Sequence, residues 1–282
     1  ATHEIYTLSL HDALPISANI SGWYGTPLGE RIRAMAGGAP TAMRNDGNIA
    51  AYAEWAVRRD KGKILLFIGL GTGIGGGYVV DGDLLGGRND RAVEIGHFIV
   101  EPGGRKCVCG AEGCAEAYAS GPSMGRIAMD IGLGREAGLG SLAAPIAEEE
   151  LNVSALARDV RQGSVVNARE VYTAFENGDP LAAKVDEVAT QALARMTATA
   201  LAMLAPDTVV LGGGVVQGAS HLLSALSSRV QALVYRDAWT DCAFEEARLG
   251  SRAGLMGAAW YGASRVMPQE ALFDLIGGAG LR

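Results

Sequence analysis

Long hydrophobic segments, an excess of positive charge and abundant cysteines are all missing from this chain. No apolar run reaches the ~18 residues of a membrane-spanning helix, because glycine, proline or charged residues interrupt each one. The formal net charge of -7 argues against broad electrostatic attraction to nucleic acid or anionic lipid. Four cysteines are few for 282 residues and nothing reads as a secretory signal, so a disulfide framework is not expected. These absences predict a cytoplasmic protein with no membrane partner.

Glycine and apolar residues are plentiful instead. Hydrophobic residues make up 49% of the chain, enough for a sizeable core in one large or two ordinary domains. The 40 glycines indicate many tight turns and ligand sites lined by backbone.

Three of the four cysteines stand close together, shortly after a histidine. His97, Cys107, Cys109 and Cys114 offer three thiols and one imidazole, the ligand count of a closed tetrahedral zinc site. A buried cysteine is often only a small hydrophobe, and a lone histidine is more often a satisfied core residue than a ligand. The clustering favours structural zinc, and the Cys-Xaa-Cys spacing would strain a local disulfide. The segment from His97 to Cys114 is called the metal loop below.

Helical and strand-like segments alternate along the chain, which is typical of α/β proteins. Residues 63–70 form a continuous apolar run that ends in glycine, and residues 78–80 resume after the glycines, so a strand-loop-strand unit is expected. Asp179-Pro180 predicts the start of a long helix. A second buried strand over residues 208–211 then leads into Gly212-Gly213-Gly214.

The loop between the first two predicted strands is rich in glycine. Its backbone amides, from Gly69 to Gly77, can approach an anion closely, and Thr72 adds a hydroxyl donor, so phosphate is the expected ligand. The loop lacks the Gly-Lys-Ser/Thr of a P-loop, and glycine-rich turns are common in hairpins and barrels. Taken alone, it leaves a phosphate site and an ordinary turn equally open.

Three acidic residues are candidates for chemistry. Asn45-Asp46 precedes an alanine-rich helix start, where such residues are more often caps than catalysts. A carboxylate held there could instead accept the proton of a substrate hydroxyl during phosphoryl transfer. Glu94 and Glu116 would place two more carboxylates at the metal loop, suited to sugar hydroxyls, although most exposed glutamates are only solvated.

Taken in order, these motifs resemble the ROK family of bacterial sugar kinases and related repressors, from about Ala18 to about Gly262. The motifs that carry the resemblance are Asn45-Asp46, Gly71 to Gly77, Glu94-Ile95-Gly96-His97, Cys107 to Glu116 and Gly212 to Gly214. The resemblance implies an α/β, actin-like (ribonuclease-H-like) fold of two lobes. It also implies that a hexose is phosphorylated by ATP, with magnesium, in the cleft between the lobes.

The same resemblance implies a role for each candidate residue. Asp46 would be the general base that takes the proton of the sugar 6-hydroxyl. The residues implied to bind sugar are Asn45, Glu94, His97 and Glu116. The residues implied to bind the nucleotide are Gly71, Thr72, Gly73, Gly212, Gly213 and Gly214. Zinc on the four metal-loop ligands would brace the loop that presents His97 and Glu116, so the loss of zinc would weaken sugar binding as well as the fold.

The N-terminal part departs from the family pattern. The family begins with a β-hairpin carrying Asp-Xaa-Gly-Gly-Thr, and nothing before Asn45 matches it. Residues 1–17 look foreign, since Leu8 to Ser17 resembles translated sequencing-adaptor DNA. The expected domains are therefore an incomplete small lobe over residues 18–60, a large lobe over 61–252, and a C-terminal helix over 253–282 that returns to the small lobe. An open sheet edge would follow, and weak or absent kinase activity is predicted for this chain.

Two single positions also differ from the family pattern. Val93 stands where the family usually has glycine, and Gly47 stands where it usually has alanine. Both lie beside candidate site residues, so both bear on how those residues are positioned.

A sugar-responsive transcriptional repressor of the same family is the main alternative, because it keeps the sugar and zinc residues and adds an N-terminal helix-turn-helix. Asp46 and the intact Gly71 to Gly77 loop favour catalysis, since a sensor needs neither a base nor a phosphate cradle. Nucleic acid is a partner only in the repressor interpretation. A zinc-stabilised interaction module would leave both glycine loops unused.

Glucose is the expected hexose, because the Cys-Xaa-Cys form of the metal loop looks most like the glucokinase branch of the family. N-acetylmannosamine and other hexoses remain open, since specificity depends on pocket shape. A homodimer is the family expectation.

Overall fold

The computed structural model describes residues 27–38, 41–58, 64–240 and 242–278. The segment expected to be foreign, residues 1–17, lies outside the described residues. Among the described helices, none is long and apolar enough to cross a bilayer.

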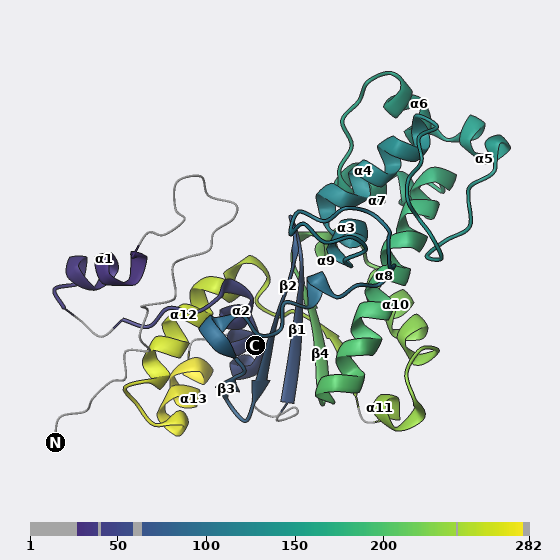
Figure 1. Ribbon diagram of the computed structural model, residues 1–282. Coiled ribbons are helices and arrows are strands. Elements are labelled where there is room, and N and C mark those ends of the chain that lie inside the picture. The colour runs from purple at the N-terminus through teal and green to yellow at the C-terminus, as the bar shows by residue number, and fades with distance from the viewer. Residues whose placement is uncertain (1–26, 39–40, 59–63, 241, 279–282) are drawn as a thin grey trace.

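A five-stranded sheet with the order β3-β2-β1-β4-β5 stands at the centre of the described chain (Figure 1). The strands are β1 (Ile64–Leu70), β2 (Ile74–Val80), β3 (Asp83–Leu84), β4 (Thr208–Gly212) and β5 (Ala243–Glu246). β1 pairs antiparallel with β2 and parallel with β4, so a hairpin and a long crossover connection meet on β1. The two strands predicted around the first glycine loop and the strand predicted before the second are confirmed.

The glycine run between β1 and β2 is divided differently from the prediction. Only residues 71–73 form the turn, and Gly75 to Gly77 belong to β2. The reason is a close helix: a Cβ on Gly77 would lie 2.6 Å from the carbonyl oxygen of Gly47 and 2.6 Å from the Cβ of Ala51. Gly77 therefore serves the close packing of β2 against α2, not the turn.

The side chains of β1 alternate between two hydrophobic clusters, one on each face of the sheet. Leu66, Ile68 and Leu70 join one cluster, and Leu65 and Phe67 join the other. Both faces are thus covered, which explains why the run reads as continuously apolar.

Helices α2 (Asp46–Val57), α12 (Ala253–Ser264) and α13 (Gln269–Gly278) cover one face of the sheet (Figure 1). α2 and α12 touch at the backbone, because a Cβ on Gly257 would lie 2.1 Å from the carbonyl oxygen of Ile49. Two helices stand where one was expected over residues 253–282, since Pro268 interrupts the chain between them. The lobe boundaries at residues 60 and 252 stay a prediction.

The other face packs against α8 (Pro180–Leu204) and α10 (Leu222–Gln231). α8 begins as predicted, with the Asp179 side chain accepting a hydrogen bond from the Ala182 amide and Pro180 in the first turn. It ends at Ala205, which adopts the left-handed conformation just before Pro206.

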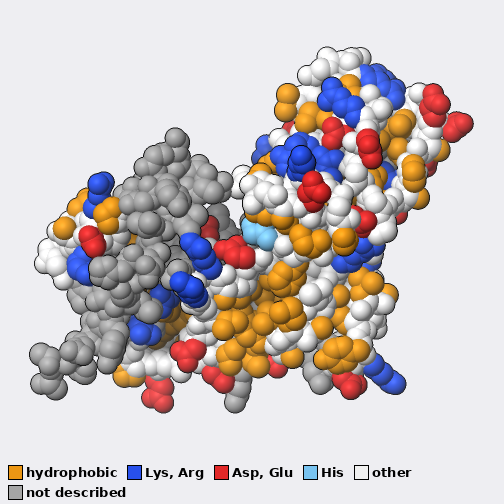
Figure 2. Space-filling model, viewed as in Figure 1, with side chains coloured by type: hydrophobic (Ala, Val, Ile, Leu, Met, Phe, Trp, Pro, Cys, Tyr) orange, Lys and Arg blue, Asp and Glu red, His pale blue; other side chains and the backbone are white. Residues whose placement is uncertain are grey.

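Further helices and 3-10 turns complete the described chain. They are α1 (Leu28–Met35), α3 (Glu116–Ala119), α4 (Gly121–Gly132), α5 (Glu148–Val153), α6 (Ala155–Arg161), α7 (Ala168–Glu176), α9 (Gly214–Gln217), α11 (Arg236–Thr240) and the 3-10 turns η1 (Arg88–Asp90), η2 (Ile95–His97) and η3 (Gly250–Arg252). α4 to α7 project beyond the sheet (Figure 1). On the face viewed in Figure 2, apolar side chains gather over the sheet, whereas charged side chains are spread over the projecting part.

Candidate active site and metal centre

The four predicted metal ligands come together. The ligand atoms of His97, Cys107, Cys109 and Cys114 all lie within 4.8 Å of one another. The Cys109 and Cys114 sulfurs are 3.6 Å apart, and the Cys107 sulfur is 3.7 Å from His97 Nδ1. An ion with four tetrahedral bonds of about 2.3 Å would separate its sulfur ligands by about 3.8 Å. The residues present therefore fit a tetrahedral ion, and the sulfurs are too far apart for a disulfide.

Protonation of the thiols follows their surroundings. Burial raises the pKa of Cys114 to about 12 and also raises the pKa of Cys107. A hydrogen bond with the backbone of Ala111 lowers the pKa of Cys109, the exposed member of the set. A metal ion binds the thiolate form, so an ion here would displace protons from the two buried thiols.

The metal loop has little regular secondary structure. Its pairing consists of isolated bridges between Ile99 and Cys114 and between Lys106 and Glu112. Gly113, at φ 84°, is packed so closely that a Cβ would lie 1.9 Å from the Glu101 carbonyl oxygen. Such a loop depends on local contacts and on its four ligands to keep its shape.

The two glycine turns lie side by side at the carboxyl ends of parallel strands. Gly69 in β1 is paired with Gly212 in β4, and a Cβ on Gly213 would lie 2.2 Å from the Leu70 carbonyl oxygen. Gly213, at φ 97°, precedes the short helix α9. Crevices at the carboxyl ends of parallel strands are common ligand sites in α/β proteins. The first glycine turn (residues 71–73) and the second (residues 212–214) are thus brought together, and their nucleotide-binding role stays a prediction.

Asn45 and Asp46 stand at the start of α2 with different surroundings. The Asn45 side chain accepts hydrogen bonds from the amides of Gly47 and Asn48, so it is the helix cap. Asp46 is exposed, and its Oδ1 accepts a 2.9 Å hydrogen bond from the Gly47 amide. A Cβ on Gly47 would lie 2.5 Å from the Gly76 carbonyl oxygen, so this turn of α2 presses directly on β2.

The segment before the metal loop touches the start of α2 through a residue that sequence reasoning missed. The Asp90 carboxylate accepts a hydrogen bond from the Asn45 amide and lies 3.9 Å from the Arg44 guanidinium. The signal that could have marked it is the cluster of charges just before Glu94. Glu94 itself is exposed, and Val93 adopts φ 64°, where a β-branched side chain is strained.

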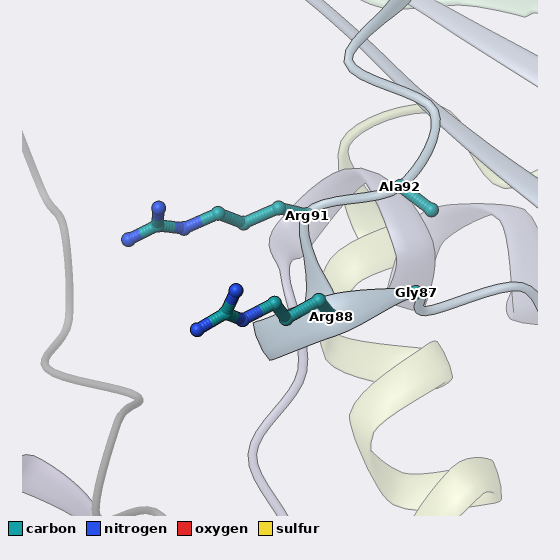
Figure 3. Close-up of a pocket in the computed structure, with 4 residues that line it drawn as sticks. All are labelled: Gly87, Arg88, Arg91 and Ala92. Atoms are coloured by element: carbon teal, nitrogen blue, oxygen red, sulfur yellow. The ribbon is translucent and has the colours of Figure 1, made fainter.

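Arg88 and Arg91 were also missed. They line a hollow of about 520 Å³ with Gly87 and Ala92, and both guanidinium groups extend to the same side (Figure 3). Their signal in the sequence was two basic residues on either side of Asp90.

Glu116 lies between the metal loop and the first glycine turn. Its Oε2 accepts a 2.8 Å hydrogen bond from the Ile74 amide, and its Oε1 is 3.8 Å from the Cys107 sulfur. A Cβ on Gly73 would lie 2.6 Å from Oε2, so the carboxylate occupies the space that glycine leaves open. The structure therefore joins Glu116 to the metal ligands and to the turn. The sugar-binding roles of Asn45, Glu94, His97 and Glu116 stay predictions.

Comparison with known proteins identifies the family to which this chain belongs. The model of the ROK family matches residues 13–264. The chain belongs to the ROK family. The match is close to the predicted range of residues 18–262, and it begins within the segment that the sequence analysis takes as foreign.

Curated relatives of the chain carry sugar kinase names. A glucokinase of Halalkalibacterium halodurans is 34% identical over 241 residues, which cover 85% of this chain and 68% of the relative. A kanosamine kinase of Amycolatopsis mediterranei is 33% identical over 236 residues, which cover 84% of this chain and 67% of the relative.

Solved structures confirm the predicted fold, the actin-like ATPase fold of ROK sugar kinases. A ROK hexokinase from Thermus thermophilus matches with a TM-score of 0.68 at 31% identity, over 86% of this chain and 70% of that one. A ROK glucokinase from Streptomyces griseus, in complex with glucose and AMPPNP, matches with a TM-score of 0.66 at 28% identity, over 84% of this chain and 72% of that one. A ROK transcriptional regulator, a homolog of the E. coli MLC protein, matches with a TM-score of 0.67 at 25% identity, over 88% of this chain and 56% of that one.

Proposed function

We propose that this chain binds a hexose and ATP and transfers the γ-phosphoryl group to the sugar 6-hydroxyl. The observation that carries the proposal is the juxtaposition of the two glycine turns at the ends of β1 and β4, with the start of α2 pressed against the neighbouring strand β2. The names of the curated relatives support the same reaction class.

In this proposal the two glycine turns hold the nucleotide. Gly71, Thr72 and Gly73 would face the phosphates, and Gly212, Gly213 and Gly214 would flank the adenosine. Backbone amides suit this role because they present donors without side chains and need no reorganisation during the reaction. Magnesium, when bound with ATP, neutralises part of the phosphate charge.

Asp46 is the proposed general base. Its carboxylate would accept the proton of the 6-hydroxyl while that oxygen forms a bond to the γ-phosphorus. The bond from the γ-phosphorus to the oxygen that bridges to the β-phosphate breaks, and ADP leaves. An exposed carboxylate at the first residue of α2 is free to reach a substrate in this way.

Glucose is the proposed sugar, with Asn45, Glu94, His97 and Glu116 as its ligands. The glucokinase relative and the glucose-bound Streptomyces griseus structure support glucose, whereas the kanosamine kinase relative makes an amino sugar the next candidate. Zinc is the proposed ion of the metal loop, since three thiols and an imidazole suit it. It would fix the shape of the loop that carries His97. A homodimer stays a prediction.

Transfer of radiolabel from γ-labelled ATP to a panel of hexoses tests the proposal, because it detects even slow turnover. Label should appear on glucose with the unaltered chain and vanish with Asp46→Asn. Asp237→Asn is a matched control, because Asp237 is also an exposed aspartate in the first turn of a helix. Equal labelling by the Asp46→Asn variant would contradict the assignment of the base.

A sugar-responsive regulator is the second candidate, favoured by the match to the ROK transcriptional regulator. Calorimetry separates the two functions. Glucose binding by the unaltered chain without any label transfer would favour the regulator, and binding with transfer would favour the kinase.

A further inference from the structure

We propose that Glu116 is a positioning residue that couples the metal loop to the first glycine turn, so that metal binding controls the affinity for nucleotide as well as for sugar. The nucleotide part of this inference rests on the proposed function. The structural part, that the metal holds the turn in place through Glu116, does not.

The contact itself is direct. Glu116 Oε2 accepts a hydrogen bond from the Ile74 amide, the first residue of β2 after the turn. A carboxylate that accepts from a backbone amide makes one of the stronger hydrogen bonds in proteins. A Cβ on Gly73, inside the turn, would lie 2.6 Å from Oε2, so the carboxylate would have to shift to admit one. The turn is therefore shaped around this carboxylate.

A second contact ties the same segment to the turn. The Gly121 amide, at the start of α4, donates a 2.8 Å hydrogen bond to the Gly71 carbonyl oxygen. Glu116 and Gly121 thus hold the turn from both of its ends. Both residues belong to the short stretch that follows Cys114, one of the four metal ligands.

That stretch transmits displacement because it is buried. Cys114, Ala115 and Tyr118 are fully buried. The Tyr118 hydroxyl accepts a hydrogen bond from the Arg105 amide, within the metal loop, and donates one to the Gly138 carbonyl oxygen, beyond it. Packed segments move as units, since interiors have few voids that could absorb a local shift. An ion that fixes Cys114 would therefore fix Glu116 two residues later.

A dual role for Glu116 is chemically consistent. A carboxylate has two oxygens and about four acceptor sites. Oε2 is used by the Ile74 amide, and Oε1, near the Cys107 sulfur, leaves acceptor capacity for a sugar hydroxyl. The side chain could then contact sugar and hold the nucleotide turn at the same time.

Calorimetric binding of AMPPNP without sugar tests the inference in the full chain. Glu116→Ala should weaken binding about tenfold, the effect of losing one hydrogen bond to a charged group. Glu116→Gln should retain most of the affinity, because its amide oxygen can still accept from Ile74. Glu112→Ala is the matched control, since Glu112 is an exposed glutamate of the same loop. Chelation of the metal should weaken binding in the unaltered chain and add little in Glu116→Ala.

Hydrogen-deuterium exchange over residues 70–76 supplies a readout that needs no nucleotide. Exchange should accelerate in Glu116→Ala and on chelation, and should stay near the unaltered rate in Glu116→Gln. Unchanged exchange and unchanged AMPPNP affinity in Glu116→Ala would overturn the inference. Accelerated exchange in a chain that binds no AMPPNP would support the coupling and overturn the kinase proposal instead. If Glu116→Ala fails to fold, chelation of the unaltered chain decides the matter, since unchanged exchange over residues 70–76 after chelation would overturn the inference.

Discussion

Helix α2 reaches the proposed site from a closely packed face of the sheet, whereas the metal loop reaches it from a segment with almost no regular structure. On the α2 side, glycines in β2 and α12 let backbones touch, as at Gly257 and Ile49. On the metal-loop side the close backbone contact, at Gly113 and Glu101, lies within the loop itself, and isolated bridges and four converging ligand atoms supply the other links. From this comparison we expect the α2 side of the site to keep its shape without an ion and the metal-loop side to depend on one. The two sides should therefore respond differently to substitution.

The largest effect is expected where the ion is removed. Cys114→Ser should abolish stoichiometric metal binding and lower the Tm by about 10 °C, since losing ~3 kcal/mol shifts Tm by ~2–4 °C per kcal/mol in chains of this size. Metal analysis and calorimetry measure both effects. Cys242→Ser, outside the cluster, should leave the metal content unchanged. Full metal content in Cys114→Ser would show that the loop does not need this ligand.

A buried ion pair offers the next largest effect, on the packed side. Glu54 is fully buried, pairs with the buried Arg58, and accepts hydrogen bonds from the amides of Arg248 and Leu249 at 3.0 and 2.9 Å. Glu54→Gln should lower the free energy of unfolding by about 3 kcal/mol, because it leaves a buried guanidinium with less compensation. Urea denaturation measures this, and metal content should not change. A loss of metal in Glu54→Gln would contradict the expectation that the two sides of the site respond independently.

Backbone contact between α2 and α12 predicts a moderate effect. Gly257→Ala should destabilise the chain by about 2 kcal/mol, since its Cβ would overlap the Ile49 carbonyl oxygen. Gly262→Ala in the same helix meets nothing within 4 Å and should be neutral or stabilising, because alanine favours helix. Urea denaturation of both variants is the measurement. Equal stability of the two would mean that the helices are not in backbone contact.

Relief of backbone strain on the metal-loop side should raise the free energy of unfolding, by less than the previous substitutions lower it. Val93 adopts φ 64°, a conformation that glycine takes without penalty. Val93→Gly should raise the free energy of unfolding by about 1 kcal/mol, the strain relieved less the added entropy of the unfolded chain. Thermal denaturation would detect it, and a destabilised variant would contradict the strained assignment.

The smallest effect on the free energy of unfolding is expected at the contact between the metal loop and α8, and this effect should depend on pH. Hydrogen bonds from Ser141, and then Arg195, hold the pKa of Glu101 below its ordinary value. A lowered pKa in the folded state stabilises the fold above the pKa of the unfolded chain, and this contribution is lost as the pH falls through the folded value. Glu101→Gln should therefore be less stable than the unaltered chain near pH 7, and the difference should shrink on acidification. If the difference in stability between the two chains did not change with pH, the lowered pKa of Glu101 could not be its cause.

Much of the framework could be predicted because its signals are local. The β1 run, the Asp179 cap of α8 and the strand before Gly212 all depend on neighbours in sequence. The four metal ligands were predictable for the same reason, since their spacing in the chain is short.

The rest depends on contacts between distant segments. Gly76 and Gly77 read as loop because the helix that presses on them, α2, precedes them and only meets them in the fold. The hydrogen bond from the Ile74 amide to Glu116 and the one from the Asn45 amide to Asp90 each join separate segments. Short polar residues such as Asp90 give no periodic pattern that would mark them in advance.

The backbone contact at Gly257 also has a mechanical consequence. Two helices that touch without intervening side chains cannot slide or roll past each other without a clash, so α2 and α12 form one stiff lever. Asp46 stands at the tip of that lever, one turn from the point of contact at Ile49. A displacement or restraint of α12 would therefore be transmitted to Asp46. A cross-link on this remote helix should thus change the position of the proposed base.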